Sequence, residues 1–253
     1  MVNLNVRPLK HIISCKICGS DSNLWGVTDF NTRGMGANHP NRYIYPLTGT
    51  AIYYHQCSSC DLIFTEAMDD WSHEEFGKYI YNEGYGDLDP NFESSRPLRI
   101  HDFIMQYLGK YHGCKMLDYG GGTGTLASLL RGSGLDCQAW DPFNDNQSYP
   151  ERNSFSFMTC IEVLEHVPDP HSTIKKISEF LTVGGVLFFS THTANGPHPE
   201  QSFSARGMNS FYVSPRTGHI TIYSEKALEV LFAAHDFQVS HIDHRYHFAM
   251  KMQ

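Results

Sequence analysis

The sequence lacks long apolar runs. No stretch of its 253 residues approaches the roughly 18 consecutive apolar residues that a membrane-spanning helix needs. Residues 1–10 also lack the hydrophobic segment of a secretory signal. With 41% hydrophobic and 18% charged residues, the composition is that of an ordinary globular protein. These features predict a cytoplasmic protein with no membrane partner.

Positive charge is also scarce. The 19 Lys and Arg residues stand against 27 Asp and Glu residues, which gives a net charge of -8, and no run of basic residues occurs. Such a field repels a phosphate backbone, so nucleic acid is a disfavoured partner. The composition does not indicate an oligomeric state.

Cysteine is present in a pattern. Cys15 and Cys18 form one CxxC pair, and Cys57 and Cys60 form a second. Two such turns can present four thiolates to one tetrahedral ion, and zinc accepts that ligand set. Disulfides, a redox CxxC and iron–sulfur ligation are the alternatives, but disulfides do not suit a chain without a secretory signal. We expect zinc in a structural role, because four thiolates leave no ligand position for water.

The cysteine pairs suggest a division of the chain. Residues 1–66 are predicted to form a small zinc-ribbon-like module, with strands at 43–45 and 52–55 between the pairs. Residues 67–97 are polar and aromatic, which is typical of a linker or a lid; their aromatic side chains could cover an active site or pack between domains. Residues 98–253 are predicted to form the catalytic domain.

A glycine-rich turn follows the first strand of this domain. Residues 115–119 are predicted as the strand, residues 120–124 read Gly-Gly-Gly-Thr-Gly, and a helix is expected from about 125 to 131. Strand, glycine loop and helix in this order open a doubly wound sheet that binds a nucleotide. A second strand at 136–140 ends at Asp141, 17 residues after the last glycine of the loop. Its carboxylate is placed to accept a ribose diol.

The glycine loop is compatible with two cofactors. Gly122, Gly124 and Ala127 satisfy the dinucleotide pattern GxGxxA. Asp118, however, directly precedes the loop, and its charge would repel a pyrophosphate while attracting the ammonium and sulfonium groups of S-adenosylmethionine. The sequence therefore favours S-adenosylmethionine.

Two motifs carry a family resemblance. Residues 117–124, Leu-Asp-Tyr-Gly-Gly-Gly-Thr-Gly, resemble motif I of class I S-adenosylmethionine-dependent methyltransferases. Residues 161–170 resemble the segment at the end of their fourth strand, and 184–190 resemble their fifth strand. The resemblance covers residues 98–253 approximately, and it implies a Rossmann-like, doubly wound, mostly parallel α/β sheet. The N-terminal cysteine pairs are similar to the zinc-binding heads of some methyltransferases of sugar, antibiotic and surface-polysaccharide pathways.

The resemblance also implies a set of cofactor contacts. In it, Asp118 and the glycines hold the methionine part, Asp141 holds the ribose, and the residues near Ile161 form the floor beneath the sulfonium. The cofactor-binding residues so implied are Asp118, Gly120, Gly122, Gly124, Asp141, Pro142, Ile161 and Glu162.

The third strand of the family is not evident. Only 13 residues separate Asp141 from the strand expected at Phe155, too few for a strand, a helix and two loops. We therefore expect that strand and its helix to be shortened or missing. Residues 144–147 could receive the adenine, but the sequence assigns no adenine contact.

Three histidines are candidates for proton transfer. Methyl transfer chiefly requires alignment of nucleophile, methyl and sulfur, but a hydroxyl acceptor also needs a base. His166, His192 and His219 all fall at or beyond the predicted carboxyl ends of strands, the edge at which α/β sheets bind ligands. We expect His219 or His192 as the base and His166 beside the cofactor.

A second metal is a further possibility. Glu162, Glu165 and His166 form E-x-x-E-H, which resembles a metal-binding triplet of ubiquinone-pathway O-methyltransferases. Mg²⁺ or Zn²⁺ held there would lower the pKa of a phenol or diol. The alternative, which we favour, is that the motif only shapes the cofactor pocket.

The acceptor is the least determined part. The segment 191–218 is long and follows the fifth strand, so it is the expected substrate loop; Phe203, Phe211 and Tyr212 could line the acceptor pocket or fix the loop to the domain. We expect methyl transfer to a small molecule, at a hydroxyl of a sugar or secondary metabolite. A methyltransferase acting on protein or RNA through the zinc module, and a dinucleotide-binding or noncatalytic protein, are the alternatives.

Overall fold

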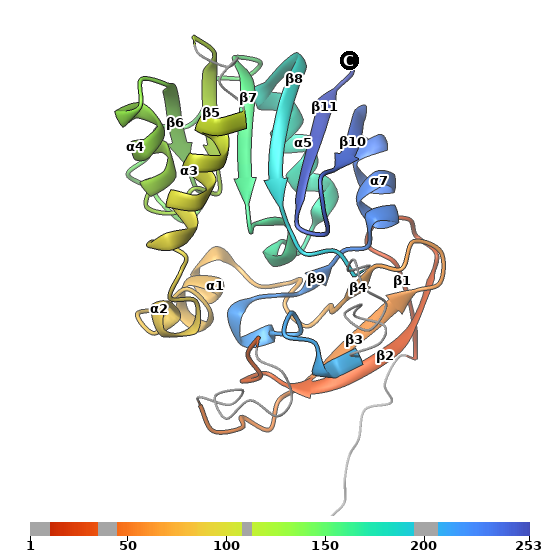
Figure 1. Ribbon diagram of the computed structural model, residues 1–253. Coiled ribbons are helices and arrows are strands. Elements are labelled where there is room, and N and C mark those ends of the chain that lie inside the picture. Colours follow the sequence, from red (N-terminus) through yellow and green to blue (C-terminus); the bar gives the residue numbers. More distant parts are fainter. Residues whose placement is uncertain (1–10, 35–44, 108–112, 195–206) are drawn as a thin grey trace, which may run out of the picture.

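The protein contains two β-sheets, one above the other in Figure 1. The computed structural model describes residues 11–34, 45–107, 113–194 and 207–253. Within these ranges, no helix has the length and apolar character to cross a bilayer.

The larger sheet has six strands in the order β10-β11-β8-β7-β5-β6. Four neighbouring strands run parallel, from β8 to β6, and β11 is antiparallel to both β8 and β10. A mostly parallel sheet of this kind is what the predicted α/β class requires. The strands are β5 (Lys115–Tyr119), β6 (Asp136–Trp140), β7 (Phe155–Ile161), β8 (Leu181–Ser190), β10 (Phe237–His241) and β11 (Tyr246–Lys251).

Helices cover both faces of this sheet (Figure 1). Side chains alternate along each strand, so Leu117 packs with α5 (Pro170–Phe180) and α7 (Glu225–Ala233) on one face. Its neighbour Met116 packs with α3 (Ser95–Tyr107) and α4 (Thr125–Gly132) on the other. Two apolar cores thus hold the carboxyl ends of the parallel strands in register.

Local capping fixes where the helices begin. The Asp169 carboxylate accepts a hydrogen bond from the Ser172 N–H at the start of α5, and the Ser224 hydroxyl accepts one from the Ala227 N–H at the start of α7. Such side chains satisfy N–H groups that have no partner inside the helix. The predicted helix start at Ser224 is confirmed.

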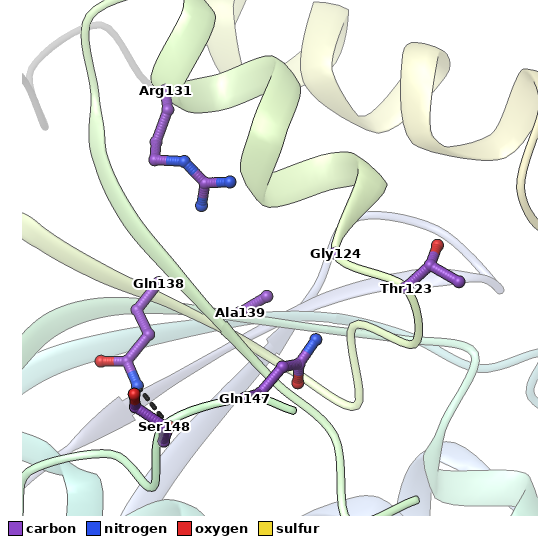
Figure 2. A pocket seen from close by; sticks show the side chains of 7 residues that line it. All are labelled: Thr123, Gly124, Arg131, Gln138, Ala139, Gln147 and Ser148. Atoms are coloured by element: carbon purple, nitrogen blue, oxygen red, sulfur yellow. Dashed lines mark hydrogen bonds between the residues drawn. The ribbon is translucent and has the colours of Figure 1, made fainter. Parts of the chain in front are cut away.

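The shortened third strand is confirmed. Residues 141–154 are fully described and contain neither a strand nor a helix, so β6 is an edge strand of the sheet. A pocket of about 480 Å³ lies against that edge (Figure 2). Arg131 of α4, Gln138 of β6 and Gln147 of the following loop surround it. The pocket borders the glycine loop through Gly124.

The smaller sheet has the order β1-β2-β3-β4-β9 and lies beyond the carboxyl ends of the parallel strands (Figure 1). Its fifth strand comes from the C-terminal part of the chain, because Ile63 pairs with Ile222. The strand expected at 52–55 lies inside β3, whereas the one expected at 43–45 falls mostly outside the described residues. The strands are β1 (Ile12–Ser14), β2 (Asp21–Asp29), β3 (Ala51–Cys57), β4 (Ile63–Phe64) and β9 (Thr221–Ile222).

Two short helices connect the sheets. These are α1 (His73–Tyr79) and α2 (Tyr85–Leu88), which lie beneath the carboxyl edge of the larger sheet in Figure 1. A capping box fixes the start of α1: the Ser72 hydroxyl accepts from the Glu75 N–H, and the Glu75 carboxylate accepts from the Ser72 N–H. The division into module, linker and catalytic domain stays a prediction.

Candidate functional site

The glycine loop makes a tight bend at the carboxyl end of β5. Gly120, Gly122 and Gly124 have φ angles of +70°, +53° and +85°, a region that other residues adopt only with strain. A Cβ on Gly120 would lie 2.5 Å from Val163 Cγ2, so that position has no room for a side chain. A Cβ on Gly122 would meet nothing within 4 Å. The bend therefore exposes backbone at Gly122 to open space.

Asp118 lies buried directly beneath this bend. Asp118 is 2% exposed, and its Oδ1 accepts a hydrogen bond from Thr159 Oγ1 at 2.6 Å. Gly121 must lack a side chain because a Cβ there would lie 2.5 Å from Asp118 Oδ2. Burial raises the pKa of Asp118 to about 7, and the charge of Asp141 adds to the effect. A carboxyl poised in this way gains much from a nearby cation.

Asp141 closes the outer side of the bend. Its Oδ2 accepts from the Gly122 N–H at 2.9 Å, and its Oδ1 accepts from the Phe143 N–H at 2.8 Å. Pro142, between Asp141 and Phe143 in the sequence, is half-buried. The two acids that the sequence singled out thus face the same glycine turn.

The amides of Asn144 and Gln147 also point to the bend. Both donate to the Gly122 carbonyl, at 3.1 Å and 3.0 Å. These donors brace the loop that the missing third strand leaves uncovered. The structure gives no reason to assign them to adenine.

Glu162 follows β7 in a strained conformation, with φ of +53°. Its Oε1 accepts from Ser190 Oγ at 2.7 Å and lies 3.5 Å from Arg245 Nε. Burial alone would raise the pKa of Glu162, but Arg245, His192 and Arg96 outweigh burial and hold it at about 2. Glu162 is therefore an ionised carboxylate beside Ile161, at the end of the strand.

Glu165 is a second buried carboxyl, with a different environment. Its Oε1 accepts a 2.6 Å hydrogen bond from the Tyr212 hydroxyl, and its Oε2 has no partner in the described structure. Burial, together with the charge of Glu162, raises the pKa of Glu165 to about 7. Two acids three residues apart therefore differ in protonation, a pattern typical of functional sites.

His166 and His219 lie beside Glu165. Their rings are 5.0 Å apart, and their ligand atoms and those of Glu165 fall within 4.8 Å of one another. His219 Nδ1 is 2.9 Å from the Tyr212 carbonyl, so that nitrogen carries the proton and Nε2 keeps its lone pair. His166 Nδ1 is buried without a partner. A cluster of ligand atoms lacking partners is what a bound cation would use.

The metal triplet suggested by the sequence is corrected by this geometry. Glu162 turns to Arg245 and Ser190, and the group at this edge that could hold an ion is Glu165, His166 and His219. The spacing E-x-x-E-H suggested Glu162 as a ligand, but spacing alone does not show in which direction the side chain of a strained residue points.

His192 stands apart from that cluster. Its ring centroid lies 5.1 Å from that of Tyr212 and 5.3 Å from that of Phe211. The negative charge of Glu162 opposes the effect of burial on the pKa of His192. Burial lowers the pKa of all three histidines to about 4. At neutral pH each is an uncharged imidazole with a lone pair. Phe203, the other aromatic residue expected here, falls outside the described residues.

Tyr212 joins these parts and was not given this role from the sequence. It is 1% exposed, and its ring lies 4.3 Å from that of His219. Its hydroxyl donates to Glu165 Oε1 and accepts from the backbone N–H of His192 at 3.1 Å. Arg245 was also missed. Neither lies in a motif, so only the folded chain brings them to Glu165 and Glu162.

The segment 67–97 covers part of this edge. Tyr81 lies 5.1 Å from Phe143 and 6.2 Å from His166, measured between ring centroids. Trp71 contacts Phe76 at 5.4 Å and also Phe30, the residue after β2, at 6.0 Å. Its aromatic residues thus contact both the site and the N-terminal sheet.

The four cysteines of the CxxC pairs converge on one point. The Sγ atoms of Cys15 and Cys60 are 3.6 Å apart, those of Cys18 and Cys57 are 3.4 Å apart, and those of Cys18 and Cys60 are 3.7 Å apart. Thiolates at about 2.3 Å from a tetrahedral zinc would be separated by roughly 3.8 Å. A disulfide would need about 2.05 Å, and all four are free thiols. The cluster therefore fits a metal and excludes disulfides within it.

Comparison with known proteins identifies the family to which the chain belongs. The sequence model of a family described as a methyltransferase domain matches residues 92–242, more than half of the chain. The chain belongs to this methyltransferase family. The glycine bend, Asp118 and Asp141 lie within the matched residues.

Curated relatives of this methyltransferase are similar over a shorter stretch. The ubiquinone biosynthesis O-methyltransferase of Escherichia coli O157:H7 is 30% identical over 153 residues, which cover 49% of this chain and 63% of that protein. That of Actinobacillus pleuropneumoniae serotype 7 is 32% identical over 123 residues, 38% of this chain and 52% of that protein. The matches span less than two thirds of the length of these relatives.

Solved structures similar to the methyltransferase include two with related names. The 1,6-didemethyltoxoflavin-N1-methyltransferase of Burkholderia thailandensis has a TM-score of 0.48 and 14% identity, with 83% of this chain and 98% of that chain covered. A SAM-dependent methyltransferase of Archaeoglobus fulgidus has a TM-score of 0.45 and 16% identity, with 62% and 76% covered.

The cysteine cluster is attached directly to the methyltransferase domain. The Cys60 carbonyl accepts from Ser224 Oγ at 2.5 Å, and the Ser59 carbonyl accepts from Lys226 Nζ, both at the start of α7. His171 of α5 donates to the Ile17 carbonyl at 2.9 Å. Both CxxC turns thus contact helices that cover the larger sheet.

Proposed function

We propose that the protein transfers a methyl group from S-adenosylmethionine to a hydroxyl of a small-molecule acceptor. The observation that carries this proposal is the pair of acids at the glycine bend: buried Asp118 beneath it and Asp141 on its outer side. Two carboxylates at one bend favour a cationic cofactor and oppose a pyrophosphate. The names of the curated relatives, which are O-methyltransferases, support an oxygen acceptor.

Each predicted cofactor residue has a place in this proposal. Asp118 attracts the ammonium of the methionine part, which can approach the backbone at Gly120 and Gly122 because these residues have no side chain. Asp141 exchanges its hydrogen bonds to the loop for hydrogen bonds to the ribose hydroxyls. Gly124 begins α4, and Pro142, Ile161 and Glu162 line the adjoining strand ends.

The acceptor hydroxyl needs a base, and the histidines are uncharged at neutral pH. We assign His192 this role, because His166 and His219 lie in the group that includes Glu165. A pKa of about 4 makes His192 a weak base. It suits an acidic hydroxyl, such as a phenol, better than an aliphatic sugar alcohol. A phenolic secondary metabolite is therefore preferred over a sugar.

A divalent cation fits the neighbouring group. Glu165 Oε2 and His166 Nδ1 are buried without partners, and the tautomer of His219 leaves its Nε2 lone pair available. We assign these three residues as ligands in place of Glu162. A bound ion there would supply Lewis acidity to the acceptor oxygen. In the Cys15, Cys18, Cys57 and Cys60 cluster we assign structural Zn²⁺.

The second metal assignment is tested without measuring turnover. Titration of the zinc-loaded protein with Mn²⁺, followed by electron paramagnetic resonance, should show one site. His219→Ala should weaken it at least about tenfold, since it removes one of three ligands, and Glu162→Gln should leave it within about twofold. Equal Mn²⁺ affinity in the wild type and His219→Ala would rule out this ligand set.

Cofactor choice is tested by calorimetry. We expect S-adenosylmethionine and S-adenosylhomocysteine to bind with one site per chain, and NAD to bind at least about 100-fold more weakly, because its pyrophosphate would face Asp118. Tight NAD binding would overturn the proposed function.

Cofactor affinity should depend on pH through Asp118. In the free protein its pKa is raised to about 7, so below that pH the carboxyl is protonated and must release its proton to face a cation. Affinity for S-adenosylmethionine should therefore rise about tenfold per pH unit up to about 7 and then level off. Asp118→Asn serves as the control, because it removes this part of the slope while the titration of the ligand itself remains. Identical slopes in both proteins would contradict the assignment of Asp118.

A further inference from the structure

Three arginines on neighbouring segments form what we call the arginine cluster: Arg33, Arg96 and Arg216. Arg33 bonds the residue before Asp89, Asp89 pairs with Arg96, and the Arg216 N–H bonds the residue before Arg33. Arg33 follows β2 by four residues, Arg96 lies on α3, and Arg216 lies in the turn Pro215–Thr217, near the end of the segment 191–218. Arg33 and Arg216 are only 7% and 6% exposed. Burial of a charged group is costly unless a partner of opposite charge compensates it.

The cluster has one carboxylate for three guanidinium groups. That carboxylate, Asp89, accepts from Arg96 Nη2 with both oxygens, at 3.0 Å and 2.8 Å. Among the described residues no carboxylate lies within 4.0 Å of a nitrogen of Arg33 or Arg216. Arg96 Nε is also buried without a partner.

Neutral groups supply the contacts that Arg33 and Arg216 do make. Arg33 Nη2 donates to the Leu88 carbonyl at 2.9 Å, and Arg216 Nη1 donates to the Ile80 carbonyl at 3.5 Å. The Arg216 guanidinium also lies 5.2 Å from the ring centroid of Tyr45. Burial lowers the pKa of both arginines. The charge of Asp89 partly offsets this for Arg33, and Tyr45 partly offsets it for both. One carbonyl needs one donor and no charge, whereas each guanidinium offers five N–H groups.

The cluster adjoins the acceptor side of the site. A Cβ on Gly218, two residues after Arg216, would lie 3.0 Å from His166 Nδ1 and 3.2 Å from Ile80 Cγ2. Arg96 is close enough to Glu162 to help lower its pKa. Arg245, which pairs with Glu162, brings the guanidinium groups on this side to four, against the carboxyls of Asp89, Glu162 and Glu165, of which Glu165 has a raised pKa. The excess positive charge occurs in a chain whose net charge is -8.

We propose that the arginine cluster binds an anionic group of the methyl acceptor, a carboxylate or a phosphate, and so selects acidic acceptors. Guanidinium groups match both anions through paired N–H donors. The inference rests on the proposed function and adds the class of substrate. Recognition of an anion beside the histidines would also orient the acceptor hydroxyl.

The test compares charged probes with neutral partners of the same shape. Protein saturated with S-adenosylhomocysteine is titrated with 3,4-dihydroxybenzoate and 3,4-dihydroxybenzamide, and separately with glucose 1-phosphate and methyl glucoside. We expect the charged member of at least one pair to bind roughly tenfold more tightly. The pair that shows the preference distinguishes a carboxylate from a phosphate.

The variants assign the preference to the cluster. Arg33→Met and Arg216→Met should each reduce it to about twofold or less, whereas Arg33→Lys and Arg216→Lys should retain part of it because they keep the charge. Arg152→Met is the matched control: it also removes one positive charge, but its side chain is 70% exposed and pairs with Glu179. Arg152→Met should keep the full preference.

Two further measurements distinguish a failure of folding or cofactor binding from a failure of anion recognition. Affinity for S-adenosylhomocysteine, measured first, shows whether each variant folds and whether the proposed cofactor site exists. Rising salt should weaken the preference of the wild-type protein. Cofactor binding without a preference in either probe pair, or a preference that survives in both methionine variants, would overturn the inference and leave the methyltransferase proposal intact.

Discussion

Replacing Gly122 with valine should reduce the affinity for S-adenosylmethionine at least about 100-fold, which corresponds to about 2.7 kcal/mol. Gly122 has a φ of +53°, and the space beyond its missing Cβ is open for 4 Å. A branched side chain would occupy the space in which we place the cofactor. It would also strain a backbone whose N–H bonds the Asp141 carboxylate.

A substitution at a second glycine distinguishes occlusion of the cofactor site from strain of the backbone. Gly134, after the end of α4, has a φ of +85° and also has nothing within 4 Å of its Cβ position. Gly134→Val should cost a similar amount of stability, about 1 to 3 kcal/mol, and leave cofactor affinity unchanged. Calorimetry with S-adenosylmethionine on both variants makes the comparison. Wild-type affinity in Gly122→Val would mean that the cofactor does not lie against this bend.

Loss of one cysteine of the cluster should have the largest effect on stability. Cys57 is 1% exposed and belongs to both β3 and the four-sulfur cluster. Cys57→Ser removes a thiolate from a closed site, and losses of a structural metal exceed about 4 kcal/mol. For a chain of this size that corresponds to a melting temperature lower by roughly 10 °C.

The effect should reach the methyltransferase domain. The Cys60 carbonyl and the Ser59 carbonyl bond residues at the start of α7, and the Ile17 carbonyl bonds His171 of α5. Cofactor affinity should therefore fall together with stability. Zinc content by mass spectrometry and thermal unfolding by circular dichroism are the measurements, with half-buried Cys114 changed to serine as the control. Unchanged zinc content and melting temperature in Cys57→Ser would contradict the metal assignment.

Local parts of the fold were predictable from the sequence. The strands at 115–119 and 136–140 and the helix start at Ser224 were placed correctly. In each case the signal lies within a few residues: an apolar run, a glycine turn or a capping side chain. The shortened third strand was predictable from chain length alone, because 13 residues cannot form a strand, a helix and two loops.

The composition of the site was less predictable. The E-x-x-E-H spacing brought Glu162 into the proposed metal triplet, whereas the structure turns it to Arg245, 83 residues later in the chain, and brings in His219. Which ionic partner a buried carboxylate takes depends on which side chains reach it through space. No local pattern records that choice.

The amino-acid sequence by itself determined the glycine bend with its two acids, the two CxxC pairs and the class of the sheet, because backbone freedom, charge and hydrophobic period act between near neighbours. Tertiary structure alone decided that β9 completes the smaller sheet, that Tyr212 joins Glu165 to the histidines, and that Asp89 pairs with Arg96 while Arg33 and Arg216 bond backbone carbonyls. Those contacts join residues far apart in the chain, and their energies arise only once burial has removed water from between them.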